Sequence, residues 1–324
     1  MGWYSAVGRT TMFTLPPETA HRLAGRALSL PLPWAKIGGA STDPSLAVTV
    51  AGIPLRNPVG LAAGFDKTGA HVDALGALGF GYVVTGTFTQ EAREGNPLPR
   101  IARFPRKRSM VNAMGLPNPG AERAATTLGT RGRPAPVFAS IADQSREAAL
   151  SCLEVLSPHV DAIELNASCP NVEWGRDGDD ESHLADLVGA LVSNTRRPVF
   201  VKLPPFLTDV AREGVLALAR IAQDSGAAGI TCSNTHPVAT DRVSVGKGGL
   251  SGRALWPHTT KIVAAVVEVT GGALPVHACG GIFGPEDVRE CLDAGASTVQ
   301  IYTSFIYEGP GIVGRLTRGI AGTH

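Results

Sequence analysis

The sequence contains little cysteine, no long hydrophobic run and no surplus of either charge. Only five of its 324 residues are cysteine, and no two of them form a CxxC pair. Neither a disulfide framework nor a zinc site is therefore indicated, and a reducing cytosol suits this pattern. The net charge of +1 argues against a nucleic-acid-binding protein, which would carry a basic surplus.

No stretch is long and apolar enough for a membrane span, which needs about 18 residues. No run without a charged residue is longer than the one between Glu268 and Glu286, and five glycines interrupt that run. The N-terminus lacks the basic-then-apolar pattern of a signal peptide. The chain is nevertheless 44% hydrophobic, so it can bury a full core, and disorder is excluded as its main state.

Eight short apolar runs recur along the chain, each followed by glycine or polar residues and then by a helical pattern. Runs of this length without alternation predict strands buried on both faces. Strand–helix alternation implies a parallel sheet in an α/β protein, and eight units favour a closed (β/α)8 TIM barrel, with an open sheet as the alternative. The runs are Val59–Ala62, Tyr82–Thr85, Val137–Ile141, Ala162–Asn166, Val199–Leu203, Gly229–Ser233, Val276–Gly280 and Thr298–Ile301. Amphipathic segments between them include Ala70–Leu78, Leu184–Asn194, Asp209–Ser225 and Lys261–Val269.

Residues 1–40 are expected to form a helical extension before a barrel over residues 41–324. Pro17 and Glu18 start a helix with one apolar stripe, and Pro31 and Pro33 end it. This helix either caps the bottom of the barrel or forms a flap that faces lipid or a ligand. Two gaps, from Gly86 to Pro136 and from Thr235 to Pro275, are too long for plain crossovers and predict insertions at the chemical face. The stripe consists of Ala20, Leu23, Ala24, Ala27 and Leu28.

Polar residues cluster at the end of the fourth predicted strand, where Asn166, Cys169 and Asn171 lie within six residues. A thiol among amide side chains is a candidate base or nucleophile when its pKa is lowered. An inert buried thiol is the alternative, and it is the preferred interpretation for the other four cysteines. Protease signatures are absent around Cys169, so proton abstraction from a neutral substrate is favoured. The other four are Cys152, Cys232, Cys279 and Cys291.

Two lysines and two glycine-rich turns stand at other predicted strand ends. Lys202 ends an apolar strand, so a position in the barrel mouth would require a partner such as a cofactor. Lys67 follows Gly64, which lets a flat ligand approach the backbone, although Lys67 by itself could be a surface charge. The turns around Gly281 and Tyr302 are typical of phosphate sites after the seventh and eighth strands of a barrel. Neither a P-loop nor the dinucleotide fingerprint is present.

With these motifs, the sequence resembles the dihydroorotate dehydrogenase family from about Leu15 to the C-terminal helix. The resemblance implies a (β/α)8 flavoprotein with FMN at the top of the barrel. Its implied activity is the oxidation of dihydroorotate to orotate in pyrimidine and UMP biosynthesis, with electrons passed to a quinone. A related FMN enzyme that uses fumarate, another acceptor or another reduced pyrimidine is the alternative. The matching runs are Asn57–Lys67, Gly79–Gly81 through Gly86–Thr87, Gly95–Pro97, Asn112 with Met114–Gly115, Asn166–Asn171, Gly248–Gly252 and Val299–Thr303.

The family has two classes, and this sequence is similar to both. The helix from Pro17 to Leu23 resembles the membrane-associated, quinone-using class 2. Cys169 stands where class 2 has serine, and Ser140 where class 2 usually has asparagine; both match the soluble class 1, as does the segment from Met114. The resemblance thus implies a class 2 frame with class 1 features in its pocket. It implies a peripheral protein on the cytoplasmic side of the cell membrane, or a cytoplasmic one if the flap is only structural.

The resemblance also implies roles for individual residues. Cys169 would take the proton from carbon 5 of dihydroorotate while the flavin accepts hydride from carbon 6, and Lys202 would stabilise the reduced flavin. His21 and Arg103 match positions beside the class 2 quinone tunnel, and no metal is implied. The implied substrate residues are Lys67, Asn112, Met114, Gly115, Leu116, Asn166, Asn171, Asn234 and Thr235. The implied FMN residues are Ala63, Gly64, Lys67, Thr87, Ser140, Asn166, Lys202, Ser233, Gly252, Gly281, Tyr302 and Thr303.

Overall fold

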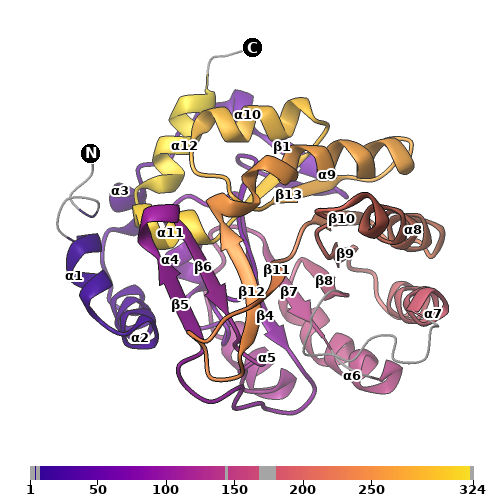
Figure 1. Ribbon diagram of the computed structural model, residues 1–324, viewed down its shortest axis with the longest axis horizontal. Helices are drawn as coiled ribbons and strands as arrows, with labels where there is room; N and C mark the ends of the chain where they lie inside the picture. Colours follow the sequence, from indigo (N-terminus) through magenta and orange to yellow (C-terminus); the bar gives the residue numbers. More distant parts are fainter. Residues whose placement is uncertain (1–3, 5–7, 143–144, 168–179, 322–324) are drawn as a thin grey trace.

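The computed structural model describes residues 4, 8–142, 145–167 and 180–321. Eight parallel strands close into a barrel and follow one another around it in chain order, with helices outside (Figure 1). This is the predicted (β/α)8 fold, and the open-sheet alternative is excluded. The barrel strands are β3 (Val59–Leu61), β4 (Tyr82–Phe88), β7 (Val137–Ile141), β8 (Ala162–Asn166), β9 (Val199–Leu203), β10 (Gly229–Cys232), β13 (Val276–Cys279) and β14 (Thr298–Ile301).

The barrel strands agree closely with the predicted ones. Four have the predicted bounds, and the others differ by at most three residues, the largest difference being in β4. Every residue of β4, β7, β8 and β9 is buried. Because both faces of such strands are buried, short apolar runs in the sequence indicate where they lie.

The outer helices follow the strands, as strand–helix alternation predicts. Ser145 and Thr208 are the N-caps of α6 and α8, since their side-chain oxygens accept the backbone N–H three residues later. Helices α7 and α9 begin four and five residues earlier than predicted. The helices are α4 (Val72–Ala77), α5 (Ala121–Gly129), α6 (Arg146–Leu156), α7 (Asp180–Ser193), α8 (Asp209–Asp224), α9 (Trp256–Val269), α10 (Pro285–Asp293), α11 (Thr303–Glu308) and α12 (Ile312–Ile320).

A short hairpin closes the bottom of the barrel. It consists of β1 (Val48–Val50) and β2 (Ile53–Leu55), which pair in an antiparallel manner. Its apolar side chains pack on Tyr82, Phe138 and Phe200, which lie at the amino ends of their strands. These three rings stack in sequence, with centroids 4.8 and 5.4 Å apart. The bottom is therefore an apolar plug, and it is made by the hairpin rather than by the N-terminal helix.

The two long insertions meet above the barrel in one antiparallel sheet. The first insertion supplies β5 (Ile101–Phe104) and β6 (Ser109–Asn112), and the second supplies β11 (His236–Ala239) and β12 (Lys247–Gly252). The order in the sheet is β11-β12-β6-β5, and Asn112 pairs with Gly249 across the central boundary (Figure 1). Both insertions follow barrel strands, so this sheet lies at the carboxyl end, as the gaps predict.

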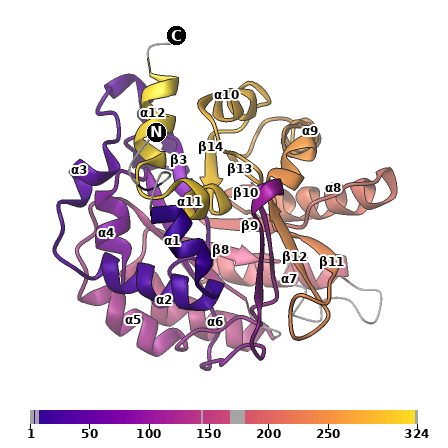
Figure 2. The ribbon, with the colours of Figure 1, turned by 60° about the vertical axis from the view of Figure 1, so that its left-hand side comes forward.

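The N-terminal helices lie beside the same end of the barrel. They are α1 (Arg9–Thr14), α2 (Pro17–Leu28) and α3 (Trp34–Gly38), and α2 starts at the predicted proline. Figure 2 shows α1 and α2 on the side of the molecule that carries α11. The Arg103 guanidinium on β5 donates to the carbonyls of Met12 (3.0 Å) and Leu15, and Glu18 accepts from the Arg100 backbone N–H (2.9 Å). These contacts fix α1 and α2 near the barrel mouth.

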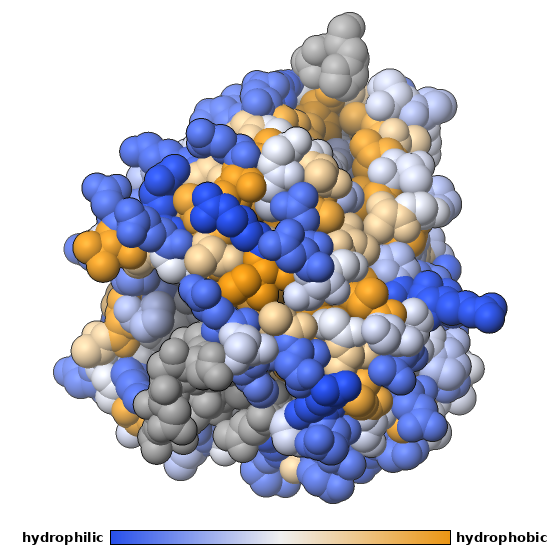
Figure 3. Space-filling model, turned by 90° about the vertical axis from the view of Figure 1, so that its right-hand side faces the viewer, coloured by the Kyte–Doolittle hydropathy of each residue, from blue (hydrophilic) through white to orange (hydrophobic). Residues whose placement is uncertain are grey.

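The face opposite α1 and α2 carries mixed side chains. On its described part, hydrophobic residues are interspersed with hydrophilic ones (Figure 3). Three exposed large apolar residues lie in the N-terminal region, where Leu23, Leu30 and Leu32 are 37%, 54% and 43% exposed. Others lie elsewhere, the most exposed being Val210 on α8 at 89%. Among the helices that the structure describes, none has both the length and the apolar character of a membrane span.

A test of the apolar plug uses Gly60, which leaves room for the Tyr82 ring. A Cβ added at Gly60 would lie 2.3 Å from the ring, and Tyr82 is held by its stack on Phe138. We expect Gly60→Ala to lower the free energy of unfolding by about 1–3 kcal/mol, because overpacking displaces buried rings. Denaturant unfolding followed by circular dichroism measures this change.

Gly214→Ala on α8 is the matched control. An added Cβ there meets nothing within 4 Å, and alanine is favoured over glycine inside a helix by about 0.5–1 kcal/mol. This variant should therefore be slightly more stable than the wild type. Equal stability of the two variants would contradict the steric explanation.

Candidate active site

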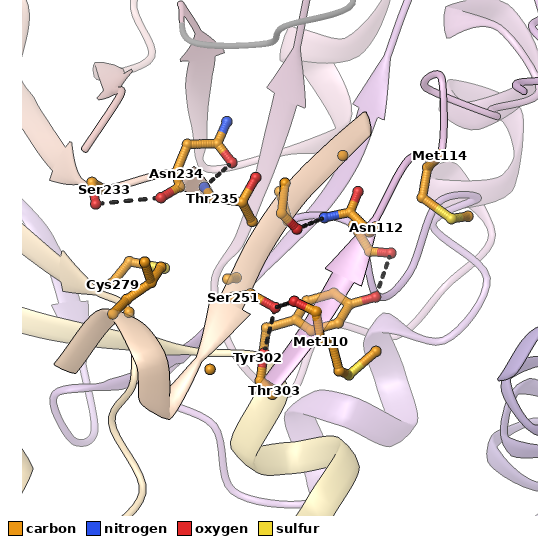
Figure 4. A pocket seen from close by; sticks show the side chains of 18 of the residues that line it. Met110, Asn112, Met114, Ser233, Asn234, Thr235, Ser251, Cys279, Tyr302 and Thr303 are labelled. Carbon is orange, nitrogen blue, oxygen red and sulfur yellow. Dashed lines mark hydrogen bonds between the residues drawn. The ribbon is translucent and has the colours of Figure 1, made fainter. Parts of the chain in front are cut away.

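A cavity of about 350 Å³ lies between the barrel mouth and the antiparallel sheet. We call it the main cavity. Figure 4 shows side chains from both insertions and from the carboxyl ends of β10, β13 and β14 around it. It brings together most of the predicted site residues, namely Ala63, Gly64, Lys67, Thr87, Asn112, Met114, Leu116, Asn166, Lys202, Ser233, Asn234, Thr235, Gly252, Gly281, Tyr302 and Thr303.

Four other predicted substrate, cofactor and catalytic residues are not among the described residues that line this cavity. Ser140 is buried behind the cavity wall, with its Oγ 3.0 Å from Thr87 Oγ1. Gly115 turns the chain between two lining residues at φ +70°, where an added Cβ would lie 2.7 Å from the Asn96 backbone nitrogen. Cys169 and Asn171 are outside the described residues, so the predicted base and this amide stay predictions.

A chain of hydrogen bonds crosses the barrel mouth and orients the amide side chains. Asn166 at the end of β8 donates to Thr87 Oγ1 (3.3 Å), which also contacts Ser140. Asn234 donates to Asn166 Oδ1 (3.0 Å) and accepts from the backbone N–H of Thr235 (2.8 Å; Figure 4). Amides held in this way present fixed donors and acceptors to a ligand, which lowers the entropy cost of binding.

The loop after β3 places Lys67 at the cavity. The buried Asp66 carboxylate accepts backbone N–H groups from Thr68 (3.2 Å), Ala70 (3.2 Å) and His71 (2.8 Å), which fixes this loop. Lys67 donates to the Gly64 carbonyl and lines the cavity. Burial lowers the pKa of Lys67 to about 8, and repulsion from Arg100 adds to the effect. An anionic ligand beside Lys67 would offset both the loss of hydration and the repulsion from Arg100, and so favour the charged ammonium.

Lys202 supplies a second cation from the floor of the cavity. Its Nζ lies 3.7 Å from Glu164 Oε1, and the two side chains are 7% and 1% exposed. Burial alone would lower the pKa of Lys202, but attraction to Glu164 and to Cys279, together with a hydrogen bond to Glu164, outweighs burial, so that the pKa is raised. The ammonium is therefore charged throughout the ordinary pH range, as the predicted cofactor contact requires.

The opposite end of the cavity is built from glycine turns and helix starts. Gly281 has φ +70°, and an added Cβ would lie 2.7 Å from the Trp256 backbone nitrogen, so only glycine fits. Asp287 Oδ2 accepts from the backbone N–H of Phe283 (2.7 Å) and from Arg253 (2.7 Å), and this arginine also donates to the Gly281 carbonyl (3.1 Å). The turn is therefore rigid and close to the start of α11, an arrangement suited to phosphate.

A second, smaller cavity of about 60 Å³ lies between the N-terminal helices and the barrel. We call it the side cavity. It is lined by both predicted tunnel residues, His21 and Arg103, and it shares Ile101, Met110 and Tyr302 with the main cavity. Burial is the main cause that lowers the pKa of His21 to about 3, and repulsion from Lys67 is the next largest. The imidazole is therefore neutral, in keeping with a largely apolar wall.

Several site residues were not predicted from the sequence. Gln300 on β14 lines the main cavity, and its buried Oε1 has no hydrogen-bond partner among the described residues. Glu164 lies just below it; a charged residue inside an apolar strand is the same signal that indicated Lys202. Cys279, expected to be inert, also lines the cavity (Figure 4), although burial raises its pKa and favours the thiol form.

Comparison with known proteins agrees with this geometry. The family model for dihydroorotate dehydrogenase matches residues 45–323. The chain is 36% identical to a dihydroorotate dehydrogenase (quinone) of Myxococcus xanthus, covering 97% of this chain and 92% of that relative. It is 37% identical to the protein of the same name from Erythrobacter litoralis, covering 97% and 93%. A DHODH crystal structure from Eimeria tenella, in complex with ferulenol, superimposes with a TM-score of 0.82 at 28% identity over 94% of this chain and 90% of that one. The chain therefore belongs to the dihydroorotate dehydrogenase family.

Proposed function

We propose that the protein oxidises dihydroorotate to orotate with FMN as its cofactor and passes the electrons to a quinone. The observation that carries this proposal is the main cavity, which combines the Lys202 ammonium on its floor with an ordered amide wall and a glycine-rich phosphate site. The name of the two bacterial relatives, dihydroorotate dehydrogenase (quinone), supports both the substrate and the acceptor.

The residues around the main cavity fit FMN. Lys202 would hold the electron-rich edge of the flavin, and Gly281, Tyr302 and Thr303 would hold its phosphate. Gly64 and Gly252, with φ of +97° and +89°, let the backbone approach a flat ring. When bound, FMN supplies the acceptor for the hydride that leaves carbon 6 of dihydroorotate.

The amide wall and Lys67 would bind the substrate. Asn112, Asn166 and Asn234 offer donors and acceptors that complement the ring amide and carbonyl groups of dihydroorotate, and Lys67 complements its carboxylate. Asn166 ends β8 at the cavity three residues before Cys169, which we propose as the base that removes the proton from carbon 5. Loss of this proton and of the hydride from carbon 6 forms the double bond of orotate.

The side cavity supports a quinone as the electron acceptor. It adjoins the main cavity at Met110 and Tyr302, and the neutral His21 and the Phe13 and Phe65 rings give it a wall suited to an apolar head group. The nearby exposed leucines of the N-terminal region lie close in sequence to the exposed Arg22 and Arg26. Such a combination suits peripheral binding to an anionic membrane surface, on the cytoplasmic side.

One experiment tests the proposed function directly. Anaerobic mixing of the yellow holoenzyme with dihydroorotate should bleach the flavin absorbance, and a quinone added afterwards should restore it. Restoration by fumarate but not by quinone would replace the acceptor in the proposal. A flavin that dihydroorotate does not bleach would overturn the assigned substrate.

The proposed base predicts a specific loss of rate. Cys169→Ala should retain FMN but slow the reduction of the flavin by dihydroorotate by about 10²-fold or more, the usual contribution of a general base. Cys169→Ser should keep some activity with a more alkaline pH profile, because a hydroxyl is harder to deprotonate than a thiol. Stopped-flow absorbance measures both rates.

Cys152→Ala is the control for the loss of a thiol, since Cys152 is buried in α6 away from both cavities. It should reduce flavin at the wild-type rate even if its melting temperature falls. Flavin reduction at the wild-type rate in Cys169→Ala would refute the assignment.

The pKa of Lys67 predicts how ligand affinity depends on pH. The ammonium attracts the carboxylate of orotate only while it is protonated, and its pKa is about 8. The dissociation constant of orotate should therefore rise by up to about tenfold per pH unit above pH 8 and stay level below pH 7. Titration of the holoenzyme with orotate between pH 6.5 and 9.5 measures this profile.

Lys67→Met should bind orotate more weakly and without this inflection. Lys261→Met, which removes an exposed lysine on α9, should retain the wild-type profile. A wild-type dissociation constant that stays constant from pH 7 to 9.5 would exclude Lys67 as the carboxylate contact.

Filling the side cavity should separate the two half-reactions. Ala24 lines this cavity, so Ala24→Phe should place a ring inside it. We expect quinone reduction to slow by about tenfold or more, while flavin reduction by dihydroorotate stays within about twofold of the wild type. Ala27→Phe on the same helix is the control, because Ala27 does not line the cavity. An unchanged quinone rate in Ala24→Phe would argue against this route.

A further inference from the structure

The floor of the main cavity rests on an ion pair between neighbouring barrel strands. Glu164 on β8 and Lys202 on β9 are both directed into the barrel, and Lys202 pairs in register with Asn166, two residues after Glu164. Lys202 Nζ lies 3.7 Å from Glu164 Oε1. Lys202 lines the cavity, whereas Glu164 is not among the described residues that do. The carboxylate can therefore act on a ligand only through neighbouring side chains, of which Lys202 and Gln300 line the cavity.

The Glu164 carboxylate is held from two other strands. Its Oε2 accepts a hydrogen bond from Thr231 Oγ1 on β10 (2.9 Å) and another from Gln300 Nε2 on β14 (3.1 Å). Thr231 is also the register partner of Lys202. Hydrogen bonds to a charged acceptor are stronger than neutral ones, so these two donors fix the direction of the carboxylate.

Lys202 depends on this carboxylate because it is buried. A cation taken out of water without a counter-charge loses its proton or moves back to water. Besides Glu164, the ionisable groups that face this region in the described part of the chain are Cys279 and His277 on β13 and Tyr82 on β4. Burial raises the pKa values of Cys279 and Tyr82 and lowers that of His277 to about 3, so all three stay neutral near pH 7.

We propose that Glu164 is a positioning residue that keeps the Lys202 ammonium charged and directed at the cofactor. The inference rests on the proposed function, because it requires FMN in the main cavity. Glu164 would then set the affinity for FMN and its reduction potential without touching it. A cation at this place favours the anionic reduced ring and so raises the potential.

The test compares Glu164→Gln, Lys202→Met and the double variant with the wild type. The measurements are the dissociation constant of FMN from the apoprotein and the midpoint potential of the bound flavin between pH 6 and 9. Glutamine has the shape of glutamate and can still accept from Thr231, so mainly the charge is lost. Glu213→Gln, on the exposed face of α8, is the control for the loss of a carboxylate and should match the wild type.

For Glu164→Gln we expect a defect that grows with pH. At pH 9, Lys202 should be largely neutral, so FMN should bind about tenfold more weakly or worse, and the potential should fall below that of the wild type. At pH 6 the lysine regains its proton, and both quantities should return to the wild-type value or rise above it. Lys67 also titrates in this range, so each value is compared with the wild type at the same pH. Glu164→Asp, which keeps the charge, should show a smaller pH-dependent defect.

The double variant shows whether Glu164 acts through Lys202. In the Lys202→Met background, Glu164→Gln should have no further effect on FMN affinity. Each single variant leaves one buried charge unpaired, so the double variant should be at least as stable as either single one. If Glu164→Gln alone does not fold, the stability of the double variant tests the proposal instead. A double variant that also fails to fold would contradict a role of Glu164 through Lys202.

The outcomes separate this inference from the proposed function. Wild-type protein that does not bind FMN would overturn both. If the wild type binds FMN, two results would overturn the inference alone. One is a Glu164→Gln defect that is equal at all pH values, and the other is a defect that persists in the Lys202→Met background. An effect that vanishes at pH 6 and in the Lys202→Met background supports it.

Discussion

The closure of eight parallel strands is the constraint on which the rest of this structure depends. Because every strand runs in the same direction, all eight carboxyl ends meet at one rim. This brings Lys67, Asn166, Lys202 and Asn234 together, although more than 160 residues separate the first from the last. The same closure pairs both edges of every barrel strand, so the backbone N–H and C=O groups of the strands bond to one another. The side chains at the rim are then available to bind ligands.

The barrel interior changes in character from bottom to top. At the bottom, the stacked rings of Tyr82, Phe138 and Phe200 lie against the β1–β2 hairpin and exclude water. Above them lie the Glu164 and Lys202 charges, which this apolar base isolates from solvent on one side. Charges in such surroundings interact strongly, which explains how one carboxylate can govern one lysine. The plug therefore contributes to the electrostatics of the site as well as to stability.

The two cavities give the proposed reaction two entrances of different chemistry. The main cavity has amide and lysine groups for a polar, anionic substrate, whereas the side cavity has aromatic and aliphatic walls under α1 and α2. In the described part of the chain, the wall between them is formed by Ile101, Met110 and Tyr302, which line both cavities. A flavin beside this wall would be reduced from the aqueous side and oxidised from the apolar side. This arrangement suits the quinone named for the bacterial relatives.

The sequence by itself determined the barrel strands, the start of α2 and most residues of the rim, because buried strands and helix starts leave local patterns. It also predicted that Lys202 lies at the barrel mouth with a partner, since a lysine ending an apolar strand needs one, and the structure places Lys202 at the main cavity beside Glu164. Only the tertiary structure decided that the two insertions pair as one sheet, that a hairpin closes the bottom, and that α2 lies at the mouth. It alone joined Glu164 to Lys202 and Gln300. These features arise from contacts between distant segments, which local hydrophobic periodicity does not encode.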